Sequence, residues 1–184
     1  MAQVGEALGG LSAFGGLVYA IASLKRWKRE RLAEKRAEVA GRAYIALIQA
    51  CNLLAVWAES CSTLLRAARS EGTLGGAGLG SFRSHHQWRD EGTREAVSEV
   101  RVAANSTAVY LEDSELQLLM EVRPLWEQIR TLGGPIGAAE RPLSDMMLES
   151  LVVKFDGYAE EARALRHRAK SLRDTARFER LPAD

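Results

Sequence analysis

Proline, cysteine and aromatic residues are scarce in this chain of 184 residues, which has four prolines, two cysteines and 7% aromatic residues. No tract of Gln, Asn, Ser or Pro indicates disorder, and no internal repeat is present. Cys51 and Cys61 fall in one helical segment, where a rise of ~1.5 Å per residue separates them by roughly 15 Å, too far for a disulfide. Because β-branched residues are few and Ala, Leu, Arg and Glu are abundant, the composition predicts an all-α fold.

The sequence also lacks the motifs that catalysis requires. The stretch GGAGLG at 75–80 is glycine-rich like a nucleotide-binding loop, but no strand precedes it and no Gly-Lys-Ser/Thr follows. The residues three and four positions from Cys51 and from Cys61 are all apolar, which is typical of inert core thiols. No serine stands in a nucleophile elbow. We therefore predict no enzyme activity and no cofactor.

Charge is strongly segregated along the chain, although the formal net charge is only +1. Residues 25–36 hold seven basic and two acidic residues, and so do residues 163–180, which makes each segment +5. The stretch between them, residues 37–162, holds 11 basic and 18 acidic residues, or −7. This pattern predicts one basic pole on an otherwise acidic protein.

Residues 7–24, ALGGLSAFGGLVYAIASL, are uncharged, and Lys or Arg occupies five of the seven positions that follow. A helix of this length spans roughly 27 Å, close to the ~30 Å hydrocarbon core of a bilayer. A secretory signal would carry its cations before the run, where Glu6 stands instead. A buried or interfacial helix is an alternative, although a core helix normally has a polar face. The run predicts a membrane anchor at residues 1–24.

The cations after the run predict its orientation. Positive residues stay cytoplasmic, so we expect a single pass through the cell (inner or plasma) membrane, with the N-terminus outside and residues 25–184 cytosolic. Small residues recur every four positions within the run, which favours close association of helices in lipid. These candidate packing residues are Ser12, Gly16 and Ala20, with Gly9 and Ala13 on a second stripe.

The cytosolic part is predicted to be an antiparallel four-helix bundle with a two-helix, coiled-coil-like neck. Its first helix continues from the anchor to about Ser70 and carries two adjacent apolar stripes, so it should be buried against more than one partner helix. A flexible glycine-rich loop is expected at 71–92, after which Thr93 caps a second helix that ends near Tyr110.

Two further helices complete this prediction. Asp113 or Ser114, with Gln117 three residues after Ser114 as a capping-box partner, begins a helix that Pro124 kinks or splits. Gly133, Gly134, Pro135 and Gly137 are expected to end it. Ser144 caps the last helix, which runs to about Arg180 and carries apolar residues three and four apart without a slip, the pattern of a heptad seam. The seam residues are Leu148, Leu151, Phe155, Tyr158, Ala162, Leu165, Ala169, Leu172 and Ala176. Whether it closes within one chain or between chains is open.

The expected helix lengths return the basic end of the last helix to residues 25–36. We therefore predict a basic collar at the membrane surface, where anionic lipid headgroups attract nearby cations. The collar residues are Lys25, Arg26, Lys28, Arg29, Arg31, Arg173, Arg177 and Arg180.

The residues His85, His86 and Trp88 form the most suggestive polar cluster, and we predict that they contact a partner. No cysteine or acidic residue lies at a recognised zinc spacing from them, so no metal site is predicted. Nucleic-acid binding by the arginines of 163–180 is disfavoured, because no aromatic residues interleave with them to stack on bases.

Three functional hypotheses follow from these features. The first is a single-pass, membrane-anchored adaptor or assembly subunit that acts through protein–protein contacts, either as a homo-oligomer or within a complex. The second is a membrane-acting effector, whose N-terminal helices oligomerise and permeabilise the bilayer under control of the cytosolic bundle. The third is a soluble helical subunit whose first helix is buried against a larger partner. The pathway and the identity of the protein partner are not encoded in any motif.

Overall fold

A computed structural model describes residues 2–70, 76–138 and 143–178, with side chains described at 19, 22–70, 80–136 and 143–175. These residues form five α-helices and contain no strand, which confirms the predicted all-α class. The helices are α1 (Ala2–Ser70), α2 (Gly76–Thr107), α3 (Asp113–Met120), α4 (Val122–Ala138) and α5 (Asp145–Phe178).

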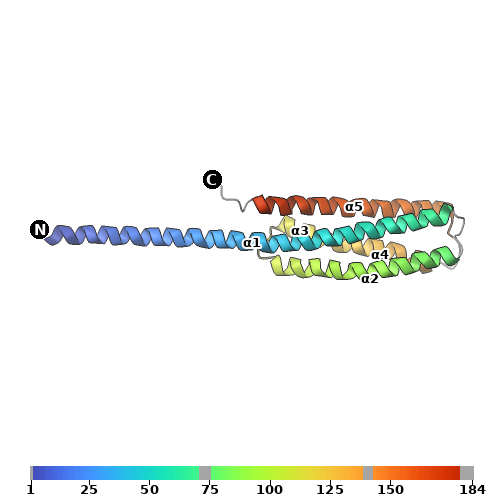
Figure 1. The fold of residues 1–184 in the computed structure, drawn as a ribbon, viewed down its shortest axis with the longest axis horizontal. Helices are drawn as coiled ribbons and strands as arrows, with labels where there is room; N and C mark the ends of the chain where they lie inside the picture. The colour runs from blue at the N-terminus through green and yellow to red at the C-terminus, as the bar shows by residue number, and fades with distance from the viewer. Residues whose placement is uncertain (1, 71–75, 139–142, 179–184) are drawn as a thin grey trace. The chain divides into compact units, whose positions relative to one another are not determined.

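The chain divides into two units, residues 1–38 and residues 39–184. The first unit consists of the N-terminal part of α1. In the second unit, α2 and α5 run antiparallel to the remaining part of α1, and α3 and α4 complete the bundle (Figure 1). The predicted two-helix neck would involve both units and stays a prediction.

The part of α1 within the bundle is buried along both predicted stripes. Tyr44 is fully buried. So are Leu47, Cys51, Leu54, Trp57 and Cys61, in a core that they share with residues of the other four helices. A stripe of this width needs neighbours on more than one side, which α2, α4 and α5 provide. The hydroxyl of Tyr44 donates to Oε1 of Glu115 at 2.5 Å and so ties α1 to the start of α3.

Helix α2 occupies most of the segment that we expected to be a flexible loop. It begins at Gly76, so residues 76–92 are helical, and Thr93 lies inside the helix, where its Oγ1 donates to the carbonyl of Arg89 at 2.7 Å. The prediction of a loop over 76–92 is therefore wrong, and residues 71–75 lie outside the described residues. The physical reason is burial: Phe82, His86, Thr93 and Val97 follow a helical spacing into the core, and this burial outweighs the low helix propensity of the glycines.

Gly80 lies in the part of α2 that was expected to be a loop, so replacing it with alanine tests whether this part is helical. A Cβ at Gly80 would meet nothing within 4 Å, so alanine should fit without strain. We expect a gain of about 0.5–1 kcal/mol in the free energy of unfolding, because alanine is the better helix former. Urea denaturation followed by circular dichroism measures this difference. A flexible loop at this position would show no gain.

The third segment of the bundle is divided at Glu121, between the end of α3 and the start of α4. Pro124 lies in the first turn of α4, where the backbone N–H groups have no intrahelical acceptor. The predicted split at Pro124 is confirmed. Of the residues predicted to end this helix, Gly133, Gly134 and Pro135 lie inside α4, which ends at Ala138, directly after Gly137, and buries Ile136.

Helix α3 begins at Asp113, one of the two predicted starts, but its capping box differs from the prediction. The backbone N–H of Glu112 donates to Oε2 of Glu115 at 2.7 Å, so the capping box is formed by Glu112 and Glu115 and not by Ser114 and Gln117. Because the other oxygen of Glu115 accepts from Tyr44 of α1, a tertiary contact favours this register.

Helix α5 matches the prediction closely. Ser144 caps it, with Oγ accepting from the backbone N–H of Met147 at 3.4 Å. The described seam residues are buried or half-buried in the core of the same chain: Leu148, Leu151, Phe155, Tyr158, Ala162, Leu165, Ala169 and Leu172. From 148 to 172 the seam therefore closes within one chain.

Candidate functional site

The basic segment after the uncharged run lies on an exposed stretch of α1. Every residue from Ala22 to Arg36 is exposed, including all five predicted cations from Lys25 to Arg31. Arg26 pairs with Glu30 at 2.9 Å and Arg31 with Glu34 at 3.9 Å, both in exposed geometry. Such exposed pairs contribute little stability. This segment therefore presents a net positive, solvated surface with an exposed tryptophan, Trp27, among its cations.

The side chains of the predicted packing stripes, from Gly9 to Ala20, lie outside the described side chains, although their backbone belongs to α1. The side chain of Arg177 and residue Arg180 likewise lie outside the described residues. Arg173 is half-buried and pairs with Asp174 at 2.9 Å. The collar as a whole stays a prediction.

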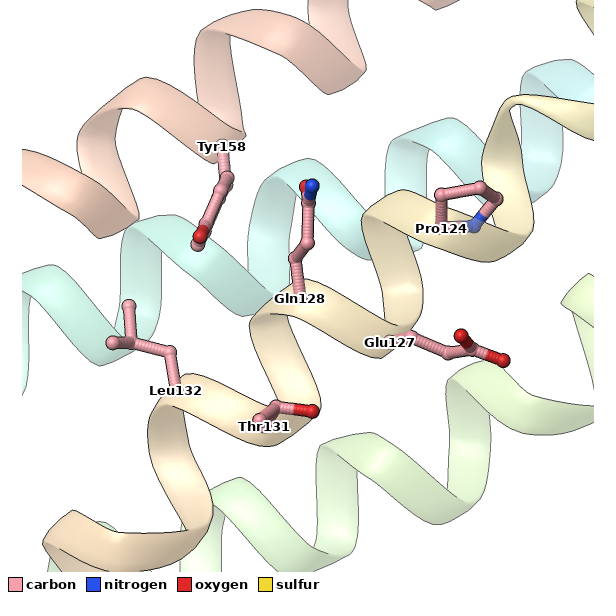
Figure 2. A pocket seen from close by; sticks show the side chains of 6 residues that line it. All are labelled: Pro124, Glu127, Gln128, Thr131, Leu132 and Tyr158. Atoms are coloured by element: carbon pink, nitrogen blue, oxygen red, sulfur yellow. The ribbon is translucent and has the colours of Figure 1, made fainter.

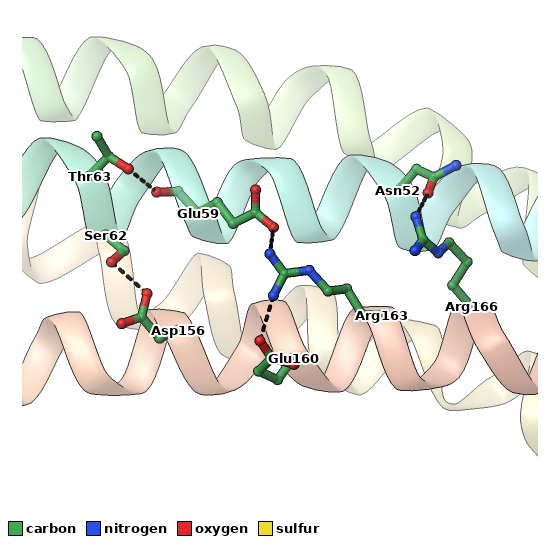
Figure 3. Close-up of polar contacts among 8 residues, drawn as sticks. All are labelled: Asn52, Glu59, Ser62, Thr63, Asp156, Glu160, Arg163 and Arg166. Atoms are coloured by element: carbon green, nitrogen blue, oxygen red, sulfur yellow. Dashed lines mark hydrogen bonds and ion pairs between the residues drawn. The ribbon is translucent and has the colours of Figure 1, made fainter.

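Several arginines of α5 are used for contacts within the bundle. Figure 3 shows Arg163 between Glu59 of α1 and Glu160 of its own helix, with ion pairs to both. Arg166 donates to Asn52 of α1 at 2.9 Å, and Arg168 pairs with Glu121. The basic stretch that begins at Arg163 is thus partly neutralised by acidic residues that are distant in sequence.

Two further polar contacts join α1 to α5. Ser62 is fully buried, and its hydroxyl donates to Oδ1 of Asp156 at 2.7 Å, while Arg66 pairs with the other oxygen of the same carboxylate (Figure 3 shows the first contact). Buried hydroxyls need such partners, because an unsatisfied polar group is costly in a core. These contacts orient the two helices relative to each other.

The three residues of the predicted partner cluster have different environments. His86 is buried between the rings of Phe82 and Trp57, with centroid distances of 5.8 and 4.9 Å, and its Nε2 lies 3.4 Å from the carbonyl oxygen of Ile129. Burial lowers the pKa of His86, and the hydrogen bond to Ile129 opposes this shift. The prediction that His86 contacts a partner is therefore wrong, because its ring is buried in the core.

His85 and Trp88 lie nearer the surface of α2. Nε2 of His85 lies 2.7 Å from Oγ of Ser60 on α1, and partial burial lowers the pKa of this imidazole. Trp88 is 62% exposed. It borders a groove of about 290 Å³ between α1 and α2, lined by Leu53, Trp88, Arg89, Glu91, Gly92 and Thr93, which we call the α1–α2 groove. The groove was not predicted, because its sides come from helices that are distant in sequence.

A second, more open groove of about 470 Å³ lies between α4 and α5. Figure 2 shows Tyr158 of α5 beside Gln128 and Leu132 of α4, with Pro124, Glu127 and Thr131 completing the lining. Its only carboxylate, Glu127, pairs with Arg123 at 2.9 Å.

The two thiols are also poor candidates for chemistry. Cys51 and Cys61 are free and buried, and burial raises the pKa of each to about 12. A thiol with such a pKa is almost entirely protonated at neutral pH and is a weak nucleophile. Among the described residues, no group of three His, Cys, Asp or Glu side chains could hold a metal ion.

One described helix stretch is long and apolar enough to cross a membrane, namely Ala22–Ser70 of α1, near the N-terminus. Half of its most apolar window is buried inside the protein, which is also the behaviour of a core helix. The side chains of residues 7–18 lie outside the described residues, so the span at residues 7–24 stays a prediction.

The fold and these surfaces define an all-α helical bundle with a long N-terminal helix. Comparison with the models of known protein families, with curated proteins and with solved structures gives no match to this chain.

Proposed function

We propose that this protein is a single-pass membrane-anchored adaptor or assembly subunit that acts through protein–protein contacts. The observation that carries the proposal is the 18-residue uncharged run at 7–24, followed on the same helix by five exposed cations between Lys25 and Arg31. An apolar run of this length matches a bilayer core, and cations directly after it favour the cytoplasmic side.

Further features support this proposal. Trp27 is 52% exposed and lies among the cations, where an indole ring is favourable at the level of lipid headgroups. The exposed cations would attract anionic lipids, and Arg173, Arg177 and Arg180 are proposed to add to this basic collar. The bundle that follows holds a dense core and, among its described residues, no group of three His, Cys, Asp or Glu side chains that could hold a metal ion.

Deletion of residues 2–24 tests the anchor. We expect the full chain to stay in the membrane fraction after an alkaline carbonate wash and the deletion variant to move almost entirely to the soluble fraction, because the apolar run supplies the affinity for lipid. Immunoblotting of the fractions measures this. The matched control replaces residues 7–24 with an unrelated run of 18 Leu and Ala residues, which should restore retention.

Two other results would change the conclusion. Release of the full chain by carbonate would contradict the anchor and favour a soluble subunit with a buried first helix. Expression of the full chain could instead cause growth arrest and dye leakage that deletion of residues 2–24 abolishes. That result would contradict the adaptor hypothesis and favour the permeabilising effector.

A further inference from the structure

The exposed face of α1 within the bundle is almost without charge. Between Ala43 and Leu65 the only charged residue is Glu59, and it pairs with Arg163 of α5. Ile45, Leu53 and Val56 lie on this face and are 37–44% exposed. The other exposed residues here, Gln49, Asn52 and Thr63, are polar but uncharged. Exposed apolar side chains grouped on one face favour contact with another protein surface.

The α1–α2 groove borders this face and combines a projection with a recess. Trp88 projects from α2, and the guanidinium carbon of Arg89 lies 4.6 Å from the centre of its ring. One helical turn later, a Cβ on Gly92 would meet nothing within 4 Å, so the groove has a recess beside the indole. Exposed tryptophans beside recesses are characteristic of the centres of protein interfaces.

Two opposite charges in the groove lack ion-pair partners. Glu91 accepts only a long hydrogen bond, 3.5 Å, from the amide of Gln87, and no ion pair involves Arg89 or Glu91 within the described part of the chain. Nε of Arg89 is buried and without a hydrogen-bond partner among the described residues. The terminal guanidinium nitrogens of Arg89 are not among these buried atoms, so a carboxylate of another subunit would approach the side chain there.

We propose that a second copy of the chain occupies the α1–α2 groove and forms a twofold symmetric dimer. In such a contact residue i of one copy meets residue j of the other, and j meets i. Trp88 of each copy then fills the recess at Gly92 of the other, and Arg89 of each copy faces Glu91 of the other. The uncharged face of α1 lies next to the groove, so it brings no like charges together across the twofold axis of the dimer.

This inference deepens the proposed adaptor function by naming one partner and the surface that binds it. The groove alone is small, so we expect a dissociation constant in the micromolar range, which a shared membrane makes effective by raising the local concentration. Failure of the anchor would appear in the carbonate wash, whereas failure of the dimer appears in the molecular mass. The two results are therefore distinguishable.

The experiment measures the mass of the full chain in detergent micelles by sedimentation equilibrium over a range of concentrations. We expect a monomer–dimer equilibrium for the natural sequence. Trp88→Ala, Arg89→Glu and Glu91→Arg should each raise the dissociation constant by about tenfold or more, through loss of the indole contact or through like charges. The double variant R89E/E91R should recover most of the affinity, because it restores both opposite-charge pairs with their signs exchanged.

Two variants separate binding from folding. Gly92→Ala fills the recess but meets no atom of its own chain, so it should weaken the dimer while the circular dichroism spectrum and melting temperature are retained. Val153→Ala removes a side chain on α5 that is 64% exposed and should leave the dimer unchanged. A monomeric natural chain would overturn the proposal. So would a dimer that no groove variant weakens, which would place self-association in the N-terminal run, or a double variant as weak as the single ones.

Discussion

Replacing Gly133 with alanine is expected to destabilise the bundle by about 1–3 kcal/mol, because the new methyl group would overpack the core. A Cβ at this position would lie 1.9 Å from Nε2 and 2.1 Å from Cδ2 of His86, well inside van der Waals contact. The imidazole has little room to retreat, since Phe82 and Trp57 pack on it and its Nε2 contacts the carbonyl of Ile129. Urea denaturation of the variant and the natural chain measures the difference.

The chain offers a matched control in the next residue. A Cβ at Gly134 would meet nothing within 4 Å, so Gly134→Ala should be neutral or stabilising by up to about 1 kcal/mol. A second test places Gly133→Ala in a His86→Ala background, where the clash is absent and the cost of the methyl group should disappear. If Gly133→Ala proves as stable as Gly134→Ala, the close packing of α4 on His86 is contradicted.

The stability of the bundle is expected to fall as the pH falls below about 6.5, the ordinary pKa of a histidine. Burial lowers the pKa of His86 in the folded state, so the unfolded chain takes up a proton that the folded chain excludes. The contribution of neutral His86 to the free energy of unfolding is fully present above the pKa of His86 in the unfolded chain. It is lost as the pH falls towards the pKa of His86 in the folded chain, with a slope of at most about 1.4 kcal/mol per pH unit for one proton. His85 adds a contribution of the same sign from its less buried ring.

His86→Gln isolates this contribution, because glutamine cannot take up the proton. We expect the variant to show a flatter dependence of unfolding free energy on pH between about 6.5 and 5, measured by urea denaturation at each pH. The charged residue that acts on His86 is Asp90, which favours the protonated imidazole and is present in both proteins. Asp90 accepts a hydrogen bond from the indole of Trp126 at 3.0 Å and pairs with Arg94. An identical pH dependence in the two proteins would show that His86 is not the titrating group.

Helix α5 shows how much of this fold can be predicted from local patterns. Its apolar residues repeat at three and four positions over its length, and this periodicity predicts both a helix and its buried face. Ser144 could be identified as the cap, because a serine directly before such a pattern satisfies the free backbone N–H groups of the first turn. These signals lie within a few residues of one another, so no knowledge of the other helices is needed to interpret them.

The first part of α2 could not be predicted from local patterns. Glycines weaken helix propensity by about 1 kcal/mol each, and their density before residue 92 predicted a loop. Phe82 and His86 have a helical spacing, but burying a phenylalanine contributes about 1.5–3 kcal/mol only when a core exists to receive it. That core is made by Trp57 of α1 and Phe155 of α5, whose positions the local sequence of α2 does not encode.

The candidate sites divide in the same way. The uncharged run at 7–24, the cations that follow it and the heptad pattern of the last helix are properties of contiguous sequence, and composition and spacing alone determined them. Only the tertiary structure decided that His86 is a core residue, that Gly133 lies against it, and that Leu53 and Trp88 border one groove. The physical reason is that burial and close packing depend on which helices become neighbours, and a single segment carries no record of its neighbours.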